Sequence, residues 1–249
     1  MLRLKNKQLN LNSTNTAFNV FIKLCYFSSM ILLLSCGSDT SKKEDTTETA
    51  PIKTEITGTA KSTTKKILFF GDSLTAGYGL EDVNDAFPAL IQSKIDSLSL
   101  KYMVLNAGLS GETTAGGKSR INWVLNNQNI DIFVLELGAN DGLRGVPLKE
   151  TRENLQAIID AVLKKNPSTR IVLAGMQLPP NMGIDYATEF KSIFPYLANK
   201  NELQLIPFLL KDVGGVTSLN QADGIHPTVK GHKMLAKNAW EVLKPMIIL

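Results

Sequence analysis

The chain has 249 residues, of which 43% are hydrophobic and 20% are charged, as is usual for a globular protein. Its formal net charge of +4 is accounted for by four basic residues within the first 35, a segment without acidic residues. The rest of the chain carries no excess charge, which argues against a surface that binds DNA or RNA.

The first 35 residues have the organisation of a signal peptide. A basic segment ends at Lys23, and a mostly apolar run follows at 24–35. That run is too short to span a bilayer, which takes about 20 residues, and suits the apolar part of a signal peptide. Cys36 then follows a small residue and resembles the lipidated cysteine of a bacterial lipoprotein signal. We expect a lipid on Cys36 that anchors the protein to a membrane of a bacterial cell envelope, as a periplasmic or outer-membrane lipoprotein. The alternative is a secretory signal or signal anchor with an incidental cysteine.

Residues 36–65 are rich in Thr, Ser, Lys and Glu and contain almost no large apolar side chain. Such a segment cannot bury enough surface to offset its ordering entropy, so we expect a disordered, solvated tether. A folded domain is expected at 66–249. It contains no cysteine, since the two in the chain are Cys25 and Cys36, which excludes a thiolate nucleophile, an internal disulfide and a cysteine-based metal site.

Beyond residue 66, short apolar runs alternate with longer amphipathic segments. Strands are expected at 67–70, 102–106, 132–137, 170–174 and 203–207. Helices are expected at 86–98, 114–127, 147–164, 187–199 and 229–246. Strands joined by helices of this length form right-handed crossovers. The sequence therefore predicts an α/β domain of three layers, α/β/α, with a five-stranded parallel sheet in the middle.

Four loops follow predicted strands or precede the last helix, and each contains a candidate functional residue. They contain Ser73, Gly111, Asn140 and the segment 223–227. In a doubly wound sheet such loops lie at one edge and converge on a crevice. A serine hydroxyl in that crevice becomes a nucleophile only when a base removes its proton.

The candidate base is His226, one of only two histidines in the chain. Asp223 lies three residues earlier, so its carboxylate can accept the Nδ1 proton and leave Nε2 for the serine. Pro227 favours an extended backbone at His226, outside the helix that follows. The alternative is that this segment is only a turn with a helix cap. His232 falls within the last helix, and we expect it on the surface.

Gly111 and Asn140 have two interpretations each. Glycine permits a tight turn, and an Asn-Asp-Gly sequence at 140–142 is typical of turns. Alternatively, the Gly111 N–H and the Asn140 amide stabilise an oxyanion, where losing one donor costs on the order of 3 kcal/mol.

Four short motifs, taken in order, resemble the four sequence blocks of the GDSL hydrolases, also called SGNH hydrolases. They are GDSL at 71–74, SGET at 110–113, GAND at 138–141 and DGIHP at 223–227. The segments ELGANDGLRG at 136–145 and LIPF at 205–208 resemble a bacterial periplasmic branch of acyl-thioesterases, lysophospholipases and arylesterases. The familiar members of that branch are soluble, so the expected lipid anchor is a departure.

The resemblance implies a flavodoxin-like sheet of strand order 2-1-3-4-5 without metal or cofactor. It implies a catalytic triad of Ser73, His226 and Asp223. The oxyanion hole would consist of the N–H groups of Ser73 and Gly111 together with the Asn140 side chain. Asp72 matches no catalytic role, and we interpret it as holding its loop by hydrogen bonds.

The expected function is that of a serine esterase, which hydrolyses a small acyl ester, thioester or lysolipid through an acyl-enzyme. We expect a monomer that binds no nucleic acid. The segment 177–184 either lines an acyl groove or only packs as a loop. The groove would include Leu143, Leu178, Pro179 and Met182, and residues 143–144 would form a mobile flap.

Two rival functions remain. A carbohydrate O-deacetylase would use the same residues on short acyl groups. A non-catalytic surface lipoprotein would bind a ligand in the same crevice. A flavin- or nucleotide-binding module is disfavoured, since no glycine-rich phosphate motif begins the first helix.

Overall fold

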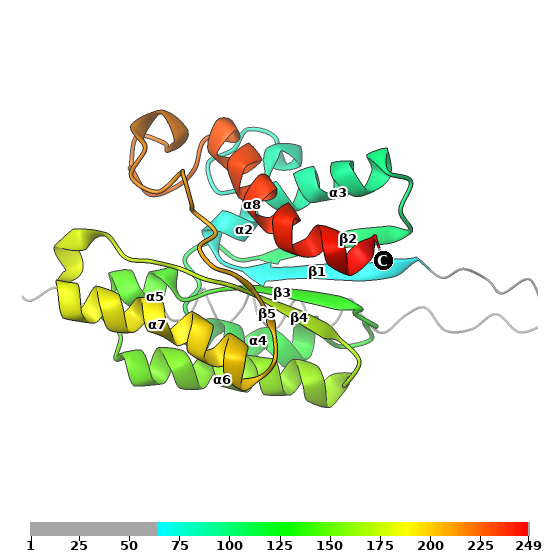
Figure 1. Cartoon of the computed structure of the whole chain (residues 1–249), viewed down its shortest axis with the longest axis horizontal. Coiled ribbons are helices and arrows are strands. Elements are labelled where there is room, and N and C mark those ends of the chain that lie inside the picture. Colours follow the sequence, from blue (N-terminus) through cyan, green and yellow to red (C-terminus); the bar gives the residue numbers. More distant parts are fainter. Residues whose placement is uncertain (1–63, 249) are drawn as a thin grey trace, which may run out of the picture. The chain divides into compact units, whose positions relative to one another are not determined.

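The computed structural model describes residues 64–248 (Figure 1). The predicted signal peptide at 1–35, the predicted lipid site Cys36 and all but the end of the predicted tether at 36–65 lie outside the described residues. Within residues 64–248, no helix has the length and apolar character needed to cross a membrane.

Five parallel strands form one sheet in the order β2-β1-β3-β4-β5. The strands are β1 Lys65–Gly71, β2 Tyr102–Gly108, β3 Ile132–Glu136, β4 Arg170–Ala174 and β5 Gln204–Ile206. This order confirms the predicted parallel α/β sheet. Strands β1 and β3 are buried along nearly their whole length because both faces of the sheet are covered.

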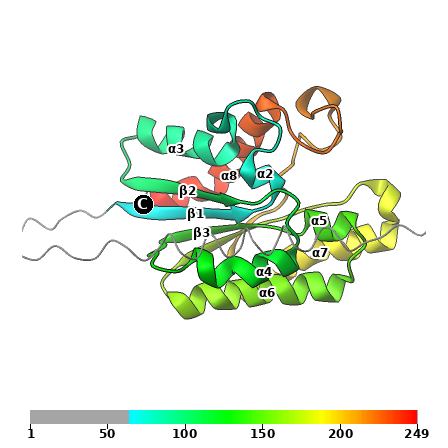
Figure 2. The same cartoon turned by 180° about the vertical axis from the view of Figure 1, so that it is seen from behind.

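Two layers of helices enclose the sheet (Figures 1 and 2). One layer contains α3 Phe87–Ser97 and α8 Val229–Ile247, and the other contains α4 Thr114–Val124, α6 Leu148–Lys165 and α7 Ile184–Lys200. Short elements complete the chain: α2 Ser73–Ala76, α5 Ala139–Leu143, and the 3-10 turns η1 Val83–Asp85, η2 Pro180–Met182 and η3 Thr217–Leu219. The three-layer prediction is confirmed.

The core of this domain lies on both faces of the sheet. Phe69 packs edge-to-face on Phe87 of α3, with ring centroids 5.4 Å apart, and Phe70 on the other face packs against Phe133 at 5.6 Å. Four apolar residues of α6 are buried against the sheet, as their spacing predicted: Leu155, Ile158, Ile159 and Val162.

The register of the sheet sets the position of three loops. Gly71, at the end of β1, pairs with Gly108 at the end of β2 and with Glu136 at the end of β3. The three strands therefore end level with one another. The loops that follow them begin side by side at the carboxyl edge of the sheet, where ligands bind in this class of fold.

Three local predictions differ from the structure. Helix α4 ends at Val124 instead of 127, and Trp123, next to its end, is 78% exposed. The helices α2 and α5 were expected to be loops. With four and five residues, they are too short for a hydrophobic period to reveal them.

Candidate active site

Ser73 is the first residue of α2, at a sharp turn after β1. Asp72 caps this helix, because its Oδ1 accepts a hydrogen bond from Leu74 N at 3.0 Å. Gly71 allows the turn, since a Cβ there would overlap the Thr75 hydroxyl and the Glu136 main-chain oxygen. The turn leaves the side chain of Ser73 only 8% exposed and directed at the segment that contains His226.

A chain of hydrogen bonds connects Ser73, His226 and Asp223. Ser73 Oγ lies 3.0 Å from His226 Nε2, and His226 Nδ1 lies 2.7 Å from Asp223 Oδ2. Because a carboxylate can only accept, Nδ1 carries the proton and Nε2 accepts from the serine hydroxyl. In this tautomer the imidazole is ready to take the serine proton.

Asp223 is ionised across the neutral range. Hydrogen bonds from the His226 side chain, and from the main-chain N–H groups of His226 and Ile225, lower the pKa of Asp223 to about 2. The two main-chain groups donate to Oδ1 at 3.0 and 2.9 Å, while Oδ2 accepts from the imidazole. The carboxylate is therefore fixed on both oxygens even though its side chain is 39% exposed.

Two residues that the sequence did not single out hold His226 in place. The ring of Tyr78 packs against the imidazole with centroids 4.5 Å apart. Gln221 Nε2 donates to the main-chain oxygens of Tyr78 and Pro227 at 2.8 and 3.0 Å, and Gln221 N donates to His226 O at 2.7 Å. No sequence signal distinguishes this glutamine from an ordinary loop residue.

Asn140 connects the loops that follow β1 and β2. Its Nδ2 donates to Asp72 Oδ2 at 3.1 Å and to Glu112 O at 3.0 Å. Gly111 adopts a positive φ of 78°, and its carbonyl accepts from Arg144 Nη2 at 3.1 Å. Neither the Ser73 N–H nor the Gly111 N–H donates to a main-chain oxygen elsewhere in residues 64–248. The three expected oxyanion donors thus belong to segments that these bonds hold together.

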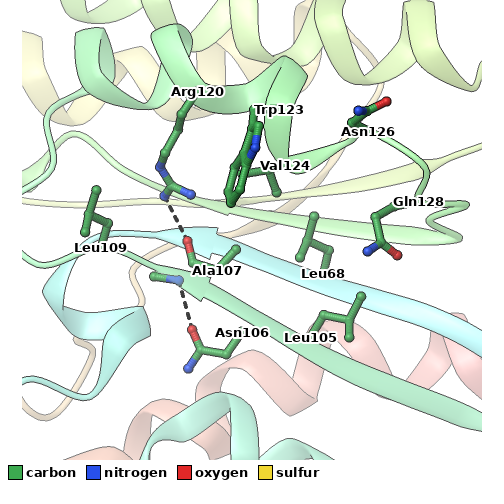
Figure 3. A pocket seen from close by; sticks show the side chains of 11 residues that line it. Leu68, Leu105, Asn106, Ala107, Leu109, Arg120, Trp123, Val124, Asn126 and Gln128 are labelled. Atoms are coloured by element: carbon green, nitrogen blue, oxygen red, sulfur yellow. Dashed lines mark hydrogen bonds between the residues drawn. The ribbon is translucent and has the colours of Figure 1, made fainter. Parts of the chain in front are cut away.

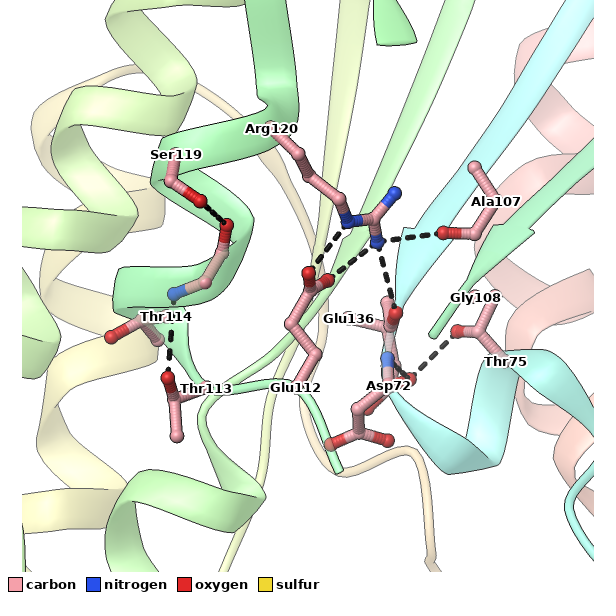
Figure 4. Close-up of polar contacts among 12 residues, drawn as sticks. Asp72, Thr75, Ala107, Gly108, Glu112, Thr113, Thr114, Ser119, Arg120 and Glu136 are labelled. Atoms are coloured by element: carbon pink, nitrogen blue, oxygen red, sulfur yellow. Dashed lines mark hydrogen bonds and ion pairs between the residues drawn. The ribbon is translucent and has the colours of Figure 1, made fainter. Parts of the chain in front are cut away.

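Two sets of polar contacts support these loops, and Figure 4 shows the one around Arg120. Arg120 of α4 pairs with Glu112 and also donates to Ala107 O at 2.8 Å, at the end of β2. Asp141, next to Asn140, accepts from Thr114 N at 2.8 Å and from the Thr114 hydroxyl. The first pair holds the loop after β2, and the second holds α5 against α4.

His232 lies in the core of the domain and not on its surface. It is fully buried, because the face of α8 that contains it packs on the start of α3, and its Nδ1 accepts from Phe87 N at 3.2 Å. Burial lowers the pKa of His232 to about 4, so the ring is neutral. It forms no hydrogen bond to Ser73, and the expectation of a surface residue was wrong.

The residues expected to line an acyl groove differ in their exposure. Leu178 is half-buried and lies against Gly142 of α5, two residues after Asn140. Leu143 is 37% exposed, Pro179 is exposed and Met182 is half-buried. Their role in binding a substrate stays a prediction.

A separate hollow of about 630 Å³ lies between the edge strand β2 and helix α4 (Figure 3). Its lining is mostly apolar and includes Leu105, Ala107, Trp123 and Val124. The lining includes none of Ser73, Asn140 or His226. Arg120 borders the hollow, but its guanidinium is hydrogen-bonded to Glu112 and to Ala107 O. This hollow is distinct from the candidate site.

Within residues 64–248, no cluster of three or more His, Cys, Asp or Glu side chains is arranged to hold a metal ion.

Comparison with known proteins places this geometry in a family. The model of the GDSL-like lipase/acylhydrolase family matches residues 69–234. The chain belongs to this family. The predicted membership and the predicted class, an enzyme that hydrolyses ester bonds, are therefore confirmed.

Two relatives show how closely the chain resembles members of this family. Esterase TesA of Pseudomonas aeruginosa is 36% identical over 189 residues, which cover 76% of this chain and 92% of TesA. An Escherichia coli enzyme named as a thioesterase, protease and lysophospholipase is 34% identical over 181 residues, covering 73% of this chain and 84% of that enzyme.

Solved structures agree with the sequence matches. A crystal structure of TesA superimposes with a TM-score of 0.70 at 37% identity, covering 73% of this chain and 99% of that one. The cold-adapted esterase EstA from Pseudoalteromonas sp., in a structure inhibited by monoethylphosphonate, gives a TM-score of 0.69 at 31% identity. That match covers 74% of this chain and all of EstA.

Proposed function

We propose that the enzyme cleaves carboxylic esters and thioesters of small acyl and lysolipid substrates through an acyl-enzyme on Ser73. The observation that carries this proposal is the hydrogen-bonded chain from Ser73 Oγ through His226 to Asp223, with contacts of 3.0 and 2.7 Å. In this proposal Ser73 is the nucleophile, His226 the general base and Asp223 the group that orients the imidazole.

The reaction has two steps. His226 Nε2 removes the hydroxyl proton as Ser73 Oγ attacks the carbonyl carbon, and the imidazolium is stabilised by the ionised Asp223. His226 then protonates the leaving alcohol or thiol as the tetrahedral intermediate collapses to the acyl-enzyme. Water then gives a proton to the same nitrogen as it attacks the acyl carbonyl carbon. The bond to Ser73 Oγ breaks as the second tetrahedral intermediate collapses, His226 returns the proton to Oγ, and the acid is released.

The proposed oxyanion hole consists of the Ser73 N–H, the Gly111 N–H and the Asn140 side chain. The two main-chain donors have no main-chain acceptor within residues 64–248, which leaves them available for an oxyanion. Both described bonds of Asn140 Nδ2 go to protein oxygens, Asp72 Oδ2 and Glu112 O. In this proposal Asn140 Nδ2 donates to the oxyanion either together with its bond to Glu112 O or in place of that bond.

Acyl chains are proposed to lie along Leu143, Leu178, Pro179 and Met182. Leu143 is the last residue of α5, the helix that contains Asn140, and Leu178 lies against Gly142 of the same helix. The names of TesA and of the Escherichia coli enzyme, an esterase and a thioesterase with lysophospholipase activity, support acyl substrates of this kind.

The folded domain at 66–249 is proposed to act as a monomer, tethered through 36–65 to a lipid on Cys36 in a bacterial cell envelope. The signal-like residues 1–35 and the cysteine after them support this arrangement. Labelling cells with a fatty-acid analogue would test the lipid anchor. We expect Cys36→Ala to abolish the label. The control Cys25→Ala should leave the label on the mature protein, because Cys25 lies in the segment that is removed. Light scattering on the tether-free domain would test the monomer.

The central test compares wild type with Ser73→Ala and with the surface control Ser93→Ala. We expect Ser73→Ala to abolish hydrolysis of p-nitrophenyl esters and labelling by a fluorophosphonate, a probe suggested by the phosphonate-inhibited EstA. Equal rates for wild type and Ser73→Ala would exclude the proposal. An unlabelled wild type would favour the non-catalytic lipoprotein, and activity on acetylated polysaccharide alone would favour the O-deacetylase.

A further inference from the structure

Glu136 is a buried acid next to the nucleophile loop that the proposed mechanism does not use. It is the last residue of β3 and is fully buried. Its Oε2 accepts from the Thr75 hydroxyl at 2.7 Å and from Asp72 N at 3.2 Å (Figure 4). The carboxyl groups of Glu136 and Asp72 are close enough to interact directly. The other oxygen, Oε1, has no donor among residues 64–248.

No cation neutralises this pair of carboxyl groups. Within residues 64–248, the ion pairs of acidic side chains are Arg120 with Glu112, Lys149 with Glu153 and His226 with Asp223. Two carboxylates in contact, both withdrawn from water, cannot both be ionised at moderate cost, so such pairs share one proton. A proton on Glu136 provides the missing donor between the two groups and removes their repulsion.

The surroundings decide which of the two acids keeps the proton. Asp72 has compensating partners, namely Leu74 N at 3.0 Å, the Asn140 amide at 3.1 Å and the nearby His226. Burial still raises the pKa of Asp72 to about 6, which leaves it ionised above that pH. Burial, and then the charge of Asp72, raise the pKa of Glu136 well above its ordinary value. Glu136 is therefore the protonated member.

We propose that Glu136 is a positioning residue that stays protonated at neutral pH and donates to Asp72, so that the Asp72 carboxylate holds the Asn140 amide at the oxyanion site. The inference rests on the proposed role of Asn140 as an oxyanion donor. Glu136 touches no reacting atom. It acts through Asp72, which uses Oδ1 to cap α2 and Oδ2 to accept from Asn140 Nδ2.

Two substitutions at Glu136 test whether its side chain acts as a hydrogen-bond donor to Asp72 or as a charged carboxylate. Glu136→Gln keeps the shape, an oxygen for Thr75 and Asp72 N, and an N–H for the Asp72 carboxylate. We expect its kcat within about threefold of wild type. Glu136→Met fills the space without a donor, and we expect kcat to fall about tenfold or more with KM within about twofold, as for a weakened oxyanion donor. Comparable losses in both variants would overturn the proposal.

A double-mutant cycle tests whether Glu136 acts through Asn140. Asn140→Ala alone should lower kcat about 10²–10³-fold, as expected for the loss of one donor. Adding Glu136→Met to Asn140→Ala should then cost little more, because both changes remove the same interaction. Fully multiplicative losses would show that Glu136 acts elsewhere, and would overturn the proposed connection.

An infrared measurement detects the proton without relying on activity. At pH 8, wild type and the inactive Ser73→Ala should both show the C=O stretch of a protonated, buried carboxyl group, and Glu136→Gln should lack it. Its absence from wild type would overturn the proposal even if Glu136→Met is too unstable to assay. If Ser73→Ala retained activity while the band was present, the proposed function would fail but the proton on Glu136 would stand.

Discussion

Gln221 Nε2 donates a hydrogen bond to the carbonyl oxygen of Tyr78 at 2.8 Å, which joins the histidine loop to the serine loop. The same nitrogen donates to Pro227 O, so one side chain connects segments 143 residues apart in the sequence. The distance between Ser73 Oγ and His226 Nε2 depends on how these two loops are held. Gln221 is therefore expected to matter for catalysis although it touches no reacting atom.

We expect Gln221→Ala to lower kcat about tenfold while KM changes little, because a small displacement of the base weakens proton transfer without altering substrate contacts. Steady-state kinetics on a p-nitrophenyl ester would measure this. Gln204→Ala, at an exposed position on β5, is the matched control. Wild-type kcat in Gln221→Ala would contradict a positioning role.

Asp223→Asn tests the proposed orienting role of the Asp223 carboxylate. An amide in this position presents an N–H to His226 Nδ1 and favours the wrong imidazole tautomer, so kcat should fall by about 10³–10⁴, as in other Ser-His-Asp enzymes. Circular dichroism would establish that the fold is retained. If more than a tenth of the activity survives, the main-chain contacts of His226 suffice to orient it and Asp223 is not essential.

The buried His232 should make folding sensitive to acid. Burial lowers the pKa of His232 to about 4 from 6.5, with Asp85 opposing the shift and His226 adding to it. Between these two values the unfolded chain binds a proton that the folded chain does not, so stability falls as pH falls. The shift corresponds to roughly 3 kcal/mol at most.

Comparison with His232→Asn isolates this contribution, because the raised pKa values of Asp72 and Glu136 affect both proteins equally. The asparagine oxygen can replace Nδ1 as the acceptor for Phe87 N. Urea unfolding at pH 7 and pH 4 should show wild type losing more of its free energy of unfolding than the variant. An identical loss in both proteins would contradict a neutral buried histidine.

Met182 tests the proposed acyl groove. Met182→Gln removes apolar contact at a half-buried position, so long acyl chains should lose more than short ones. We expect the ratio of kcat/KM for C12 to C2 p-nitrophenyl esters to fall about fivefold, with the C2 value nearly unchanged. An unchanged ratio would show that the segment 177–184 only packs as a loop.

The features that the sequence predicted correctly are those encoded by long patterns or by single unusual residues. The apolar run that contains Phe69 and Phe70 marks a strand buried on both faces, and the periodic apolar face of α6 marks a long helix. Asp223 and His226 stood out because histidine is rare in this chain and the two lie three residues apart. The structure places His226 in contact with both Asp223 and Ser73, and the catalytic roles of the three residues stay a prediction.

What the sequence did not reveal depends on contacts between distant segments. Nothing local to His232 distinguishes it from a surface residue of α8, since its burial comes from α3. The hydrogen bonds of Asn140 to Asp72 and Glu112 join three loops, and the proton of Glu136 depends on a neighbour 64 residues earlier in the chain. These contacts depend on how the strands align in the sheet, and no single segment of the sequence determines that alignment.

The hydrogen bonds of Asp223 have a consequence for how the protein reaches its active form. Its carboxylate accepts from Ile225 N, His226 N and the imidazole, all within four consecutive residues. The proposed base and its orienting acid are therefore assembled by local turn formation. Ser73, 153 residues from His226, meets this unit only when the loop docks at the edge of the sheet. During refolding, strand pairing and helix formation can thus precede any activity. Recovery of esterase activity would then measure when the loop that contains His226 docks against Ser73, which is the last long-range contact to form.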